Sequence, residues 1–85
     1  MIARLCEAAQ QALENGAPKV AADLMNRALA EATSAAERID LLRRTAHAEV
    51  GTGRETALAH LEEALRLSTD PRERAEIALE VAEAY

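Results

Sequence analysis

The fold of this chain is decided by residues 34–50, which read SAAERIDLLRRTAHAEV. The first four have capping-box spacing, in which the Ser34 hydroxyl accepts from the Glu37 amide and the Glu37 carboxylate reaches back. At 100° per residue, the apolar positions that follow form two arcs instead of one. The first arc is Leu41, Thr45 and Ala48, and the second is Ile39, Leu42, Ala46 and Val50. A helix with two apolar arcs is expected to have packed neighbours on both sides.

The composition around this stretch favours a small all-α domain. The chain has 85 residues, of which 49% are hydrophobic, and its only aromatic residue is Tyr85. Alanine fills 21 positions and leucine 11, whereas β-branched residues are few. These proportions favour helix and oppose an all-β fold. We therefore expect one domain over residues 1–85, with a core of small aliphatic contacts.

Glycine and proline divide the chain into five expected helices. All five of these residues fall at three places: Gly16 with Pro18, Gly51 with Gly53, and Pro71. Glycine can end a helix in the left-handed conformation, and proline suits the first turn of the next. The sequence Asp70-Pro71 then repeats the start signal near the C-terminus. The expected helices cover about 2–15, 18–32, 34–50, 54–68 and 70–85.

These signals recur when the chain is shifted by 36 residues against itself. Ala21, Met25, Ala28 and Leu29 align with Ala57, Leu61, Ala64 and Leu65. Leu5 aligns with Leu41 and Ile77, and Ala12 with Ala48 and Ala84. A helix–turn–helix unit is therefore predicted to repeat about two and a half times, with repeat one over 2–33, repeat two over 34–69 and a half repeat over 70–85.

The last predicted helix has the pattern of a first helix but no mate follows it in the sequence. One of its two arcs consists of Ala75, Ala78 and Ala82, with Tyr85 beside it. We expect this arc to be uncovered, either because the chain is a fragment of a larger protein or because a second copy covers it in a homodimer.

The charged residues oppose some classes of partner. The formal net charge is −5, which opposes direct contact of this segment with nucleic acid.

The single cysteine, Cys6, excludes an internal disulfide and suits a reducing cytoplasm. Neither a membrane span nor a secretion signal is predicted, because the apolar runs are short.

The second helices of the two repeats resemble tetratricopeptide-like repeats. Ala21-x3-Met25-x2-Ala28 and Ala57-x3-Leu61-x2-Ala64 fit the alanine, large residue, alanine series of that family, and Gly16 sits at its turn glycine. The first helices fit less well, because Leu5 and Ala12 stand where the family has aromatic residues. The resemblance implies antiparallel helix hairpins stacked in a right-handed superhelix.

Two longer stretches resemble the helical-repeat region of large ATP-binding, LuxR-type bacterial transcription regulators. They are residues 16–31, GAPKVAADLMNRALAE, and residues 61–74, LEEALRLSTDPRER. In such regulators a P-loop ATPase precedes the helical array and a DNA-binding module follows it. Neither a phosphate-binding loop nor a basic recognition helix is found in this chain. The resemblance implies a middle segment that senses or assembles.

The polar side of the first helices is the strongest candidate for a binding surface. We call it the charged strip, and its residues are Asp40, Arg43, Arg44, His47, Glu76, Glu80 and Glu83. Tetratricopeptide-like arrays commonly bind a peptide or a protein partner along one face, so the strip is predicted to bind protein. The alternatives are a plain solvated face and self-association through Ala75, Ala78, Ala82 and Tyr85.

A chemical role is the competing hypothesis. A small enzyme or metal-binding protein would use His47 and His60 with nearby acids. Neither histidine has the spacing of a known metal motif, and Cys6 lies on an apolar arc where a small buried residue is expected. We therefore predict a protein without catalytic activity, cofactor or metal.

Overall fold

The structure is a computed structural model, and it describes residues 2–49 and 53–84. These residues form five α-helices without any strand: α1 (Ile2–Glu14), α2 (Pro18–Ala30), α3 (Ala35–Glu49), α4 (Arg54–Leu67) and α5 (Pro71–Ala84). The predicted all-α class is confirmed, and each helix ends within two residues of its expected boundary. No helix of the described chain combines the length and apolarity needed to cross a bilayer.

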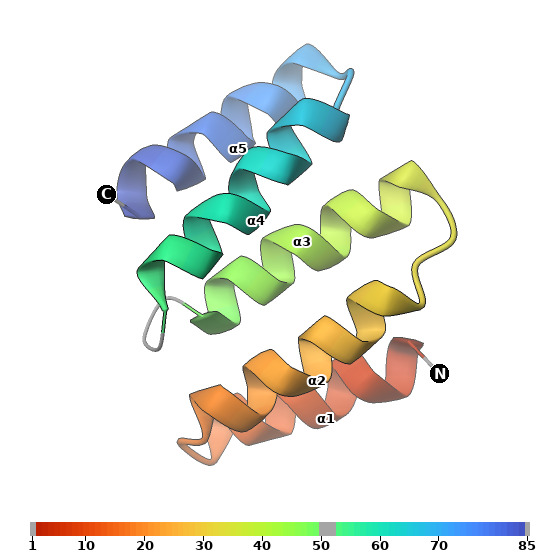
Figure 1. The fold of residues 1–85 in the computed structure, drawn as a ribbon, viewed down its shortest axis with the longest axis vertical. Helices are drawn as coiled ribbons and strands as arrows, with labels where there is room; N and C mark the ends of the chain where they lie inside the picture. Colours follow the sequence, from red (N-terminus) through yellow and green to blue (C-terminus); the bar gives the residue numbers. More distant parts are fainter. Residues whose placement is uncertain (1, 50–52, 85) are drawn as a thin grey trace.

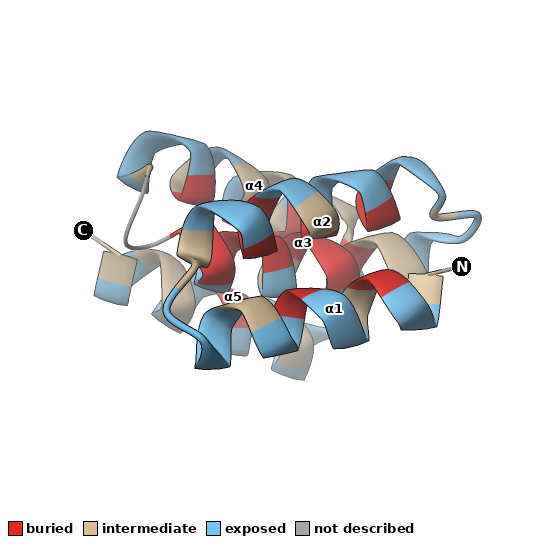
Figure 2. Ribbon diagram, turned by 90° about the horizontal axis from the view of Figure 1, so that it is seen from below, coloured by how far each residue is buried: buried red, intermediate tan, exposed pale blue. Residues whose placement is uncertain are grey.

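Consecutive helices pack side by side in a stack that runs from α1 and α2 to α5 (Figure 1). Seen along the stack, α2 and α4 lie in one layer, α1 and α5 lie in the other, and α3 runs between them (Figure 2). The molecule measures 34 × 29 × 17 Å along its principal axes. This packing is consistent with a helical repeat.

The end of α1 depends on a left-handed glycine. Gly16 has a φ of 75°. Its amide donates to the Leu13 carbonyl at 3.1 Å, and the Ala17 amide donates to the Ala12 carbonyl at 2.8 Å. This pair of bonds satisfies carbonyls that the end of the helix would otherwise leave without partners. The predicted glycine turn is confirmed.

The predicted starts of α3 and α5 have side-chain caps. The Glu37 amide donates to Ser34 Oγ at 3.1 Å, and the Arg72 amide donates to Asp70 Oδ1 at 3.1 Å. The carboxylate of Glu37 differs from a simple capping box, because it accepts from the Thr33 amide at 2.9 Å. It thus reaches one residue further back and fixes the connection that leads into α3.

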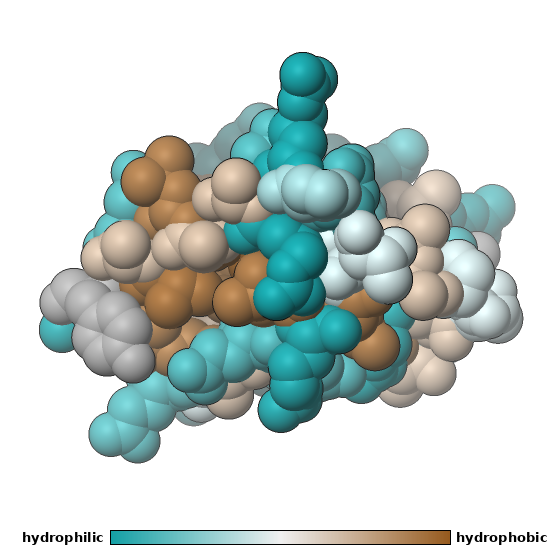
Figure 3. Space-filling view, turned by 90° about the horizontal axis from the view of Figure 1, so that it is seen from above, coloured by the Kyte–Doolittle hydropathy of each residue, from teal (hydrophilic) through white to brown (hydrophobic). Residues whose placement is uncertain are grey.

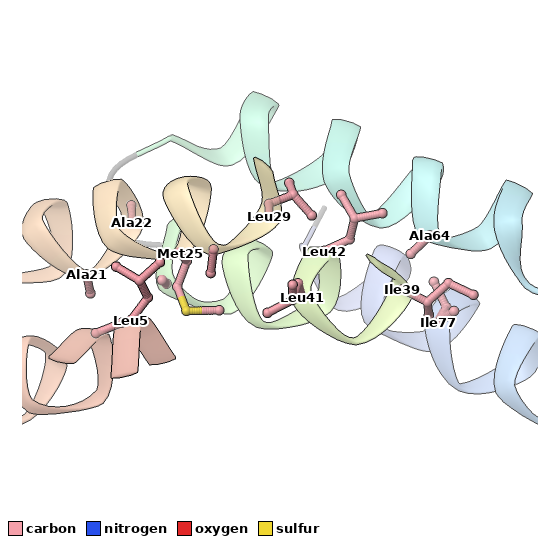
Figure 4. Close-up of a cluster of buried hydrophobic side chains, with 13 residues drawn as sticks. Leu5, Ala21, Ala22, Met25, Leu29, Ile39, Leu41, Leu42, Ala64 and Ile77 are labelled. Carbon is pink, nitrogen blue, oxygen red and sulfur yellow. The ribbon is translucent and has the colours of Figure 1, made fainter. Parts of the chain in front are cut away.

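The central helix α3 is buried on two sides, as its two arcs predict. Seven of its residues are buried: Ile39, Leu41, Leu42, Thr45, Ala46, Ala48 and Glu49. Leu42 lies between Leu29 of α2 and Ala64 of α4 (Figure 4), and Ala46 packs with Ala57 and Leu61 of α4. Residue 50, the last member of the second predicted arc, lies outside the described residues.

The recurring apolar residues of each second helix form one stripe, and the stripes of α2 (Ala21, Met25, Ala28, Leu29) and α4 (Ala57, Leu61, Ala64, Leu65) form the contacts with neighbouring helices. Ala21, Ala28, Ala57 and Ala64 are all fully buried. Because a methyl group occupies so little space, the helices approach closely at these positions, and Met25 and Leu61 fill the remaining volume.

The first helix is one residue out of the predicted 36-residue register. The residues that α1 buries are Leu5 and Ala9, and α2 is its main neighbour. They take the place on α1 that Leu42 and Ala46 take on α3, which is a spacing of 37. The cause is that the connection from Ala9 to Ala21 is one residue longer than that from Ala46 to Ala57.

This register gives α1 a polar outer side. Arg4, Ala8 and Gln11 stand where α3 has the buried Leu41, Thr45 and Ala48, and all three are exposed.

The outer side of α5 is apolar instead. Ile77 is fully buried, whereas Ala75, Ala78 and Ala82 are exposed, and Leu79 keeps 62% of its surface accessible. Figure 3 looks onto this end of the stack and shows apolar side chains gathered between hydrophilic ones. Tyr85, which was expected beside this arc, lies outside the described residues.

Two leucines test this packing. We expect Leu61→Ala to lower the free energy of unfolding by about 2–5 kcal/mol, because it opens a cavity between α3, α4 and α5. Leu79→Ala is the matched control and should cost less than about 0.5 kcal/mol, since the side chain is exposed. Urea denaturation followed by circular dichroism measures both, and equal costs would show that the α4 stripe is misplaced.

Candidate protein-binding face

The charged strip lies on α3 and α5, and ion pairs join its two halves. Arg43 Nε donates to Glu80 Oε1 at 2.7 Å, and Arg43 Nη1 lies 3.9 Å from Glu76 Oε1. The other oxygen of Glu80, Oε2, lies 2.8 Å from His47 Nε2. Glu80 therefore holds two α3 side chains at once, and its carboxylate ties α3 to α5 on this face.

The environment of Arg43 favours its protonated, charged form. The hydrogen bond to Glu80 raises the pKa of Arg43 above its ordinary value, although partial burial opposes this, and the nearby negative charges of Glu80, Glu76 and Glu73 add to the rise. Arg43 is therefore a fixed cation, and part of the negative charge of α5 is neutralised inside the protein.

Arg44 and Asp40 form a separate pair within α3. Arg44 Nε lies 3.2 Å from Asp40 Oδ2, and more than half of each side chain is exposed. Such an exposed pair one helical turn apart contributes little to stability. Both groups thus remain accessible to a partner at small cost.

A first hollow opens between α1 and α3, and we call it the α1–α3 hollow. Its volume is about 460 Å³. Its lining contains apolar and polar side chains: Cys6, Glu7, Ala9, Gln10, Leu13, Met25, Arg44, His47 and Ala48. Cys6 is thus half-buried at a hollow instead of fully buried as expected.

A second hollow opens between α3 and α5, with α4 beneath it, and we call it the α3–α5 hollow. Its volume is about 230 Å³. It is lined by Ala46, His47, Leu61, Glu80, Glu83 and Ala84. His47 lines both hollows, so they lie on either side of one exposed side chain.

The second histidine, His60, is largely buried and bonds to a glutamate of a neighbouring helix. His60 Nδ1 lies 2.6 Å from Glu49 Oε1, and the two side chains are only 16% and 8% exposed. A carboxylate oxygen accepts, so the ring nitrogen donates. A hydrogen bond offsets part of the cost of burying a carboxylate, so this bond supports the contact between α3 and α4.

The structure does not bring the two histidines into one site. His47 is bonded to Glu80 and His60 to Glu49, so each has a glutamate of a different helix. Within residues 2–49 and 53–84, no three histidine, cysteine, aspartate or glutamate side chains are grouped so that they could hold a metal ion.

Sequence reasoning missed the Glu49–His60 pair and two other links between helices. Arg38 Nη2 of α3 lies 2.9 Å from Glu63 Oε2 of α4. Arg74 of α5 donates to the carbonyls of Leu65 and Ser68 at the end of α4. The available signal for the buried pair was that Glu49 follows Ala46 by one turn on an otherwise apolar arc and therefore needs a polar partner.

No protein-family model, no curated protein and no solved structure matches this chain. Its function is therefore inferred from its residues and their geometry.

Replacing the two histidines is expected to have unequal effects on stability. We expect His60→Ala to lower the free energy of unfolding by about 1–3 kcal/mol, because a buried carboxylate loses a hydrogen-bond donor. His47→Ala should change it by less than about 0.5 kcal/mol, since the His47 side chain is 66% exposed. Thermal and urea denaturation measure both variants. A His47→Ala variant as unstable as His60→Ala would contradict the assignment of His60 as the structural one.

Proposed function

We propose that this chain is a non-enzymatic scaffold that binds a protein or peptide partner along the face formed by α1, α3 and α5. The observation that carries the proposal is the pair of hollows on either side of His47. Each combines an apolar floor with charged side chains at its rim. This combination is typical of a surface that anchors apolar groups and orients them with polar contacts.

The links between α3 and α5 support a preformed surface. Glu80 accepts from Arg43 and is bonded to His47, so the strip is held in place before a partner arrives. Because little side-chain entropy is then lost on binding, a modest contact area can give useful affinity.

The resemblance of residues 16–31 and 61–74 supports a more specific proposal. In it the chain is the helical-repeat segment of a bacterial transcription regulator, with tetratricopeptide-like hairpins in a right-handed superhelix, working in the cytoplasm. The segment would then assemble the regulator or sense a partner, while neighbouring domains act on ATP and DNA.

A second candidate function is self-association into a homodimer. The exposed alanine arc of α5 and the exposed Leu79 favour it, because an apolar helix face gains free energy when a second copy covers it. This surface lies outside both hollows, so the two candidate functions are compatible.

Two neighbouring glutamines test the binding face. Gln10 lines the α1–α3 hollow, whereas Gln11 is exposed and does not line it. Peptides are selected on the wild-type chain from a display library that tiles the proteins encoded by the source genome. We expect Gln10→Trp to fill the hollow and weaken the selected peptides at least about tenfold, with Gln11→Trp within about twofold of wild type.

Circular dichroism of both variants controls for folding. Equal binding by all three proteins would contradict the proposed face, as would a library that yields no binders. Light scattering on the same samples tests self-association, since a monomer at millimolar concentration would exclude the homodimer.

A further inference from the structure

The α3–α5 hollow has the chemistry of a pocket for a long cationic side chain. Its floor is made of Ala46, Leu61 and Ala84, which offer apolar surface without any polar atom from a side chain. Lysine and arginine lay their aliphatic stems along such surfaces while the charged head stays near water. The floor thus suits the stem of either residue.

The rim supplies the negative charge that the head requires. Glu80 and Glu83 both line the hollow. Glu80 is already bonded to Arg43 and His47, whereas Glu83 forms no ion pair or hydrogen bond within the part of the chain that the structure describes. Arg54 and Glu83 both line a smaller hollow next to this one, but in the described part of the chain they form no ion pair with each other. Glu83 is therefore the acid left to meet a cation.

The wider charge distribution favours the same ligand. Residues 55–85 supply the whole net charge of −5, with eight acids against three arginines: Glu55, Glu62, Glu63, Asp70, Glu73, Glu76, Glu80 and Glu83 against Arg66, Arg72 and Arg74. Arg38 and Arg43 of α3 neutralise Glu63 and Glu80, and the excess of acids that remains in this part of the molecule attracts cationic groups.

We propose that the α3–α5 hollow binds a guanidinium or ammonium side chain of the partner, with its stem on Ala46, Leu61 and Ala84 and its head against Glu83. The inference rests on the proposed function, because it assigns one recognition element of the partner that crosses this face. The partner segment is accordingly basic where it passes α5.

The direct test uses the full chain and a small probe. N-acetyl-arginine amide is titrated into isotope-labelled protein, with N-acetyl-citrulline amide as the neutral probe of nearly identical shape. We expect saturable NMR shifts at Ala46, Leu61 and Ala84 with arginine and at least about tenfold weaker binding of citrulline. Equal binding of both probes, or shifts elsewhere only, would overturn the proposal.

Two variants separate a pocket from general attraction to acidic surface. Glu83→Gln should weaken the arginine probe at least about fivefold. Glu62→Gln, which removes an exposed acid of α4 outside the hollow, should leave it within about twofold. An equal loss of affinity in both variants would show that the probe is held only by general attraction to acidic surface, and it would overturn the assignment.

The same probe distinguishes this inference from the proposed function. If selected peptides bind and Gln10→Trp weakens them, but neither arginine nor Glu83→Gln has an effect, the cation pocket fails and the scaffold stands. If the arginine probe behaves as expected while the library yields no binders, the pocket stands and the proposed binding of a partner protein fails.

Discussion

The burial of α3 on two sides is the constraint on which the rest of the structure depends. A helix that touches only one neighbour needs a single apolar side, but α3 packs between α2 and α4 and must present apolar surface to both. Alanine makes this possible, because Ala46 and Ala48 keep the axes close while Leu41 and Leu42 fill the space on either side. The side of α3 that remains carries Asp40, Arg43, Arg44 and His47, which form the α3 half of the charged strip.

Much of the fold could be predicted because the signals are local. Gly16, Ser34 and Asp70 act within one turn of the helix that they end or begin, so their effects can be recognised in the sequence without tertiary information. The register of α1 against α3 could not be derived in this way. It depends on the length of a connection, and a single additional residue between Ala9 and Ala21 moves the buried side of α1 by one position.

The candidate face was predictable as a strip but not as a site. Helical periodicity places Arg43 and His47 on the same side of α3, but it does not indicate that both reach Glu80. The hollows were not predictable, because a hollow is the volume that side chains of several helices fail to fill. His60 shows the same limit, since its contact with Glu49 crosses from one helix to another and has no repeated spacing.

The two ends of the stack differ in a way that limits how copies can assemble. The outer side of α1 carries Arg4 and Gln11, whereas the outer side of α5 carries alanines and Leu79. An apolar end gains nothing from docking on a polar end, so head-to-tail chaining of copies is disfavoured. In the homodimer proposed above, two copies would therefore meet α5 to α5, which is an isologous contact that closes at two.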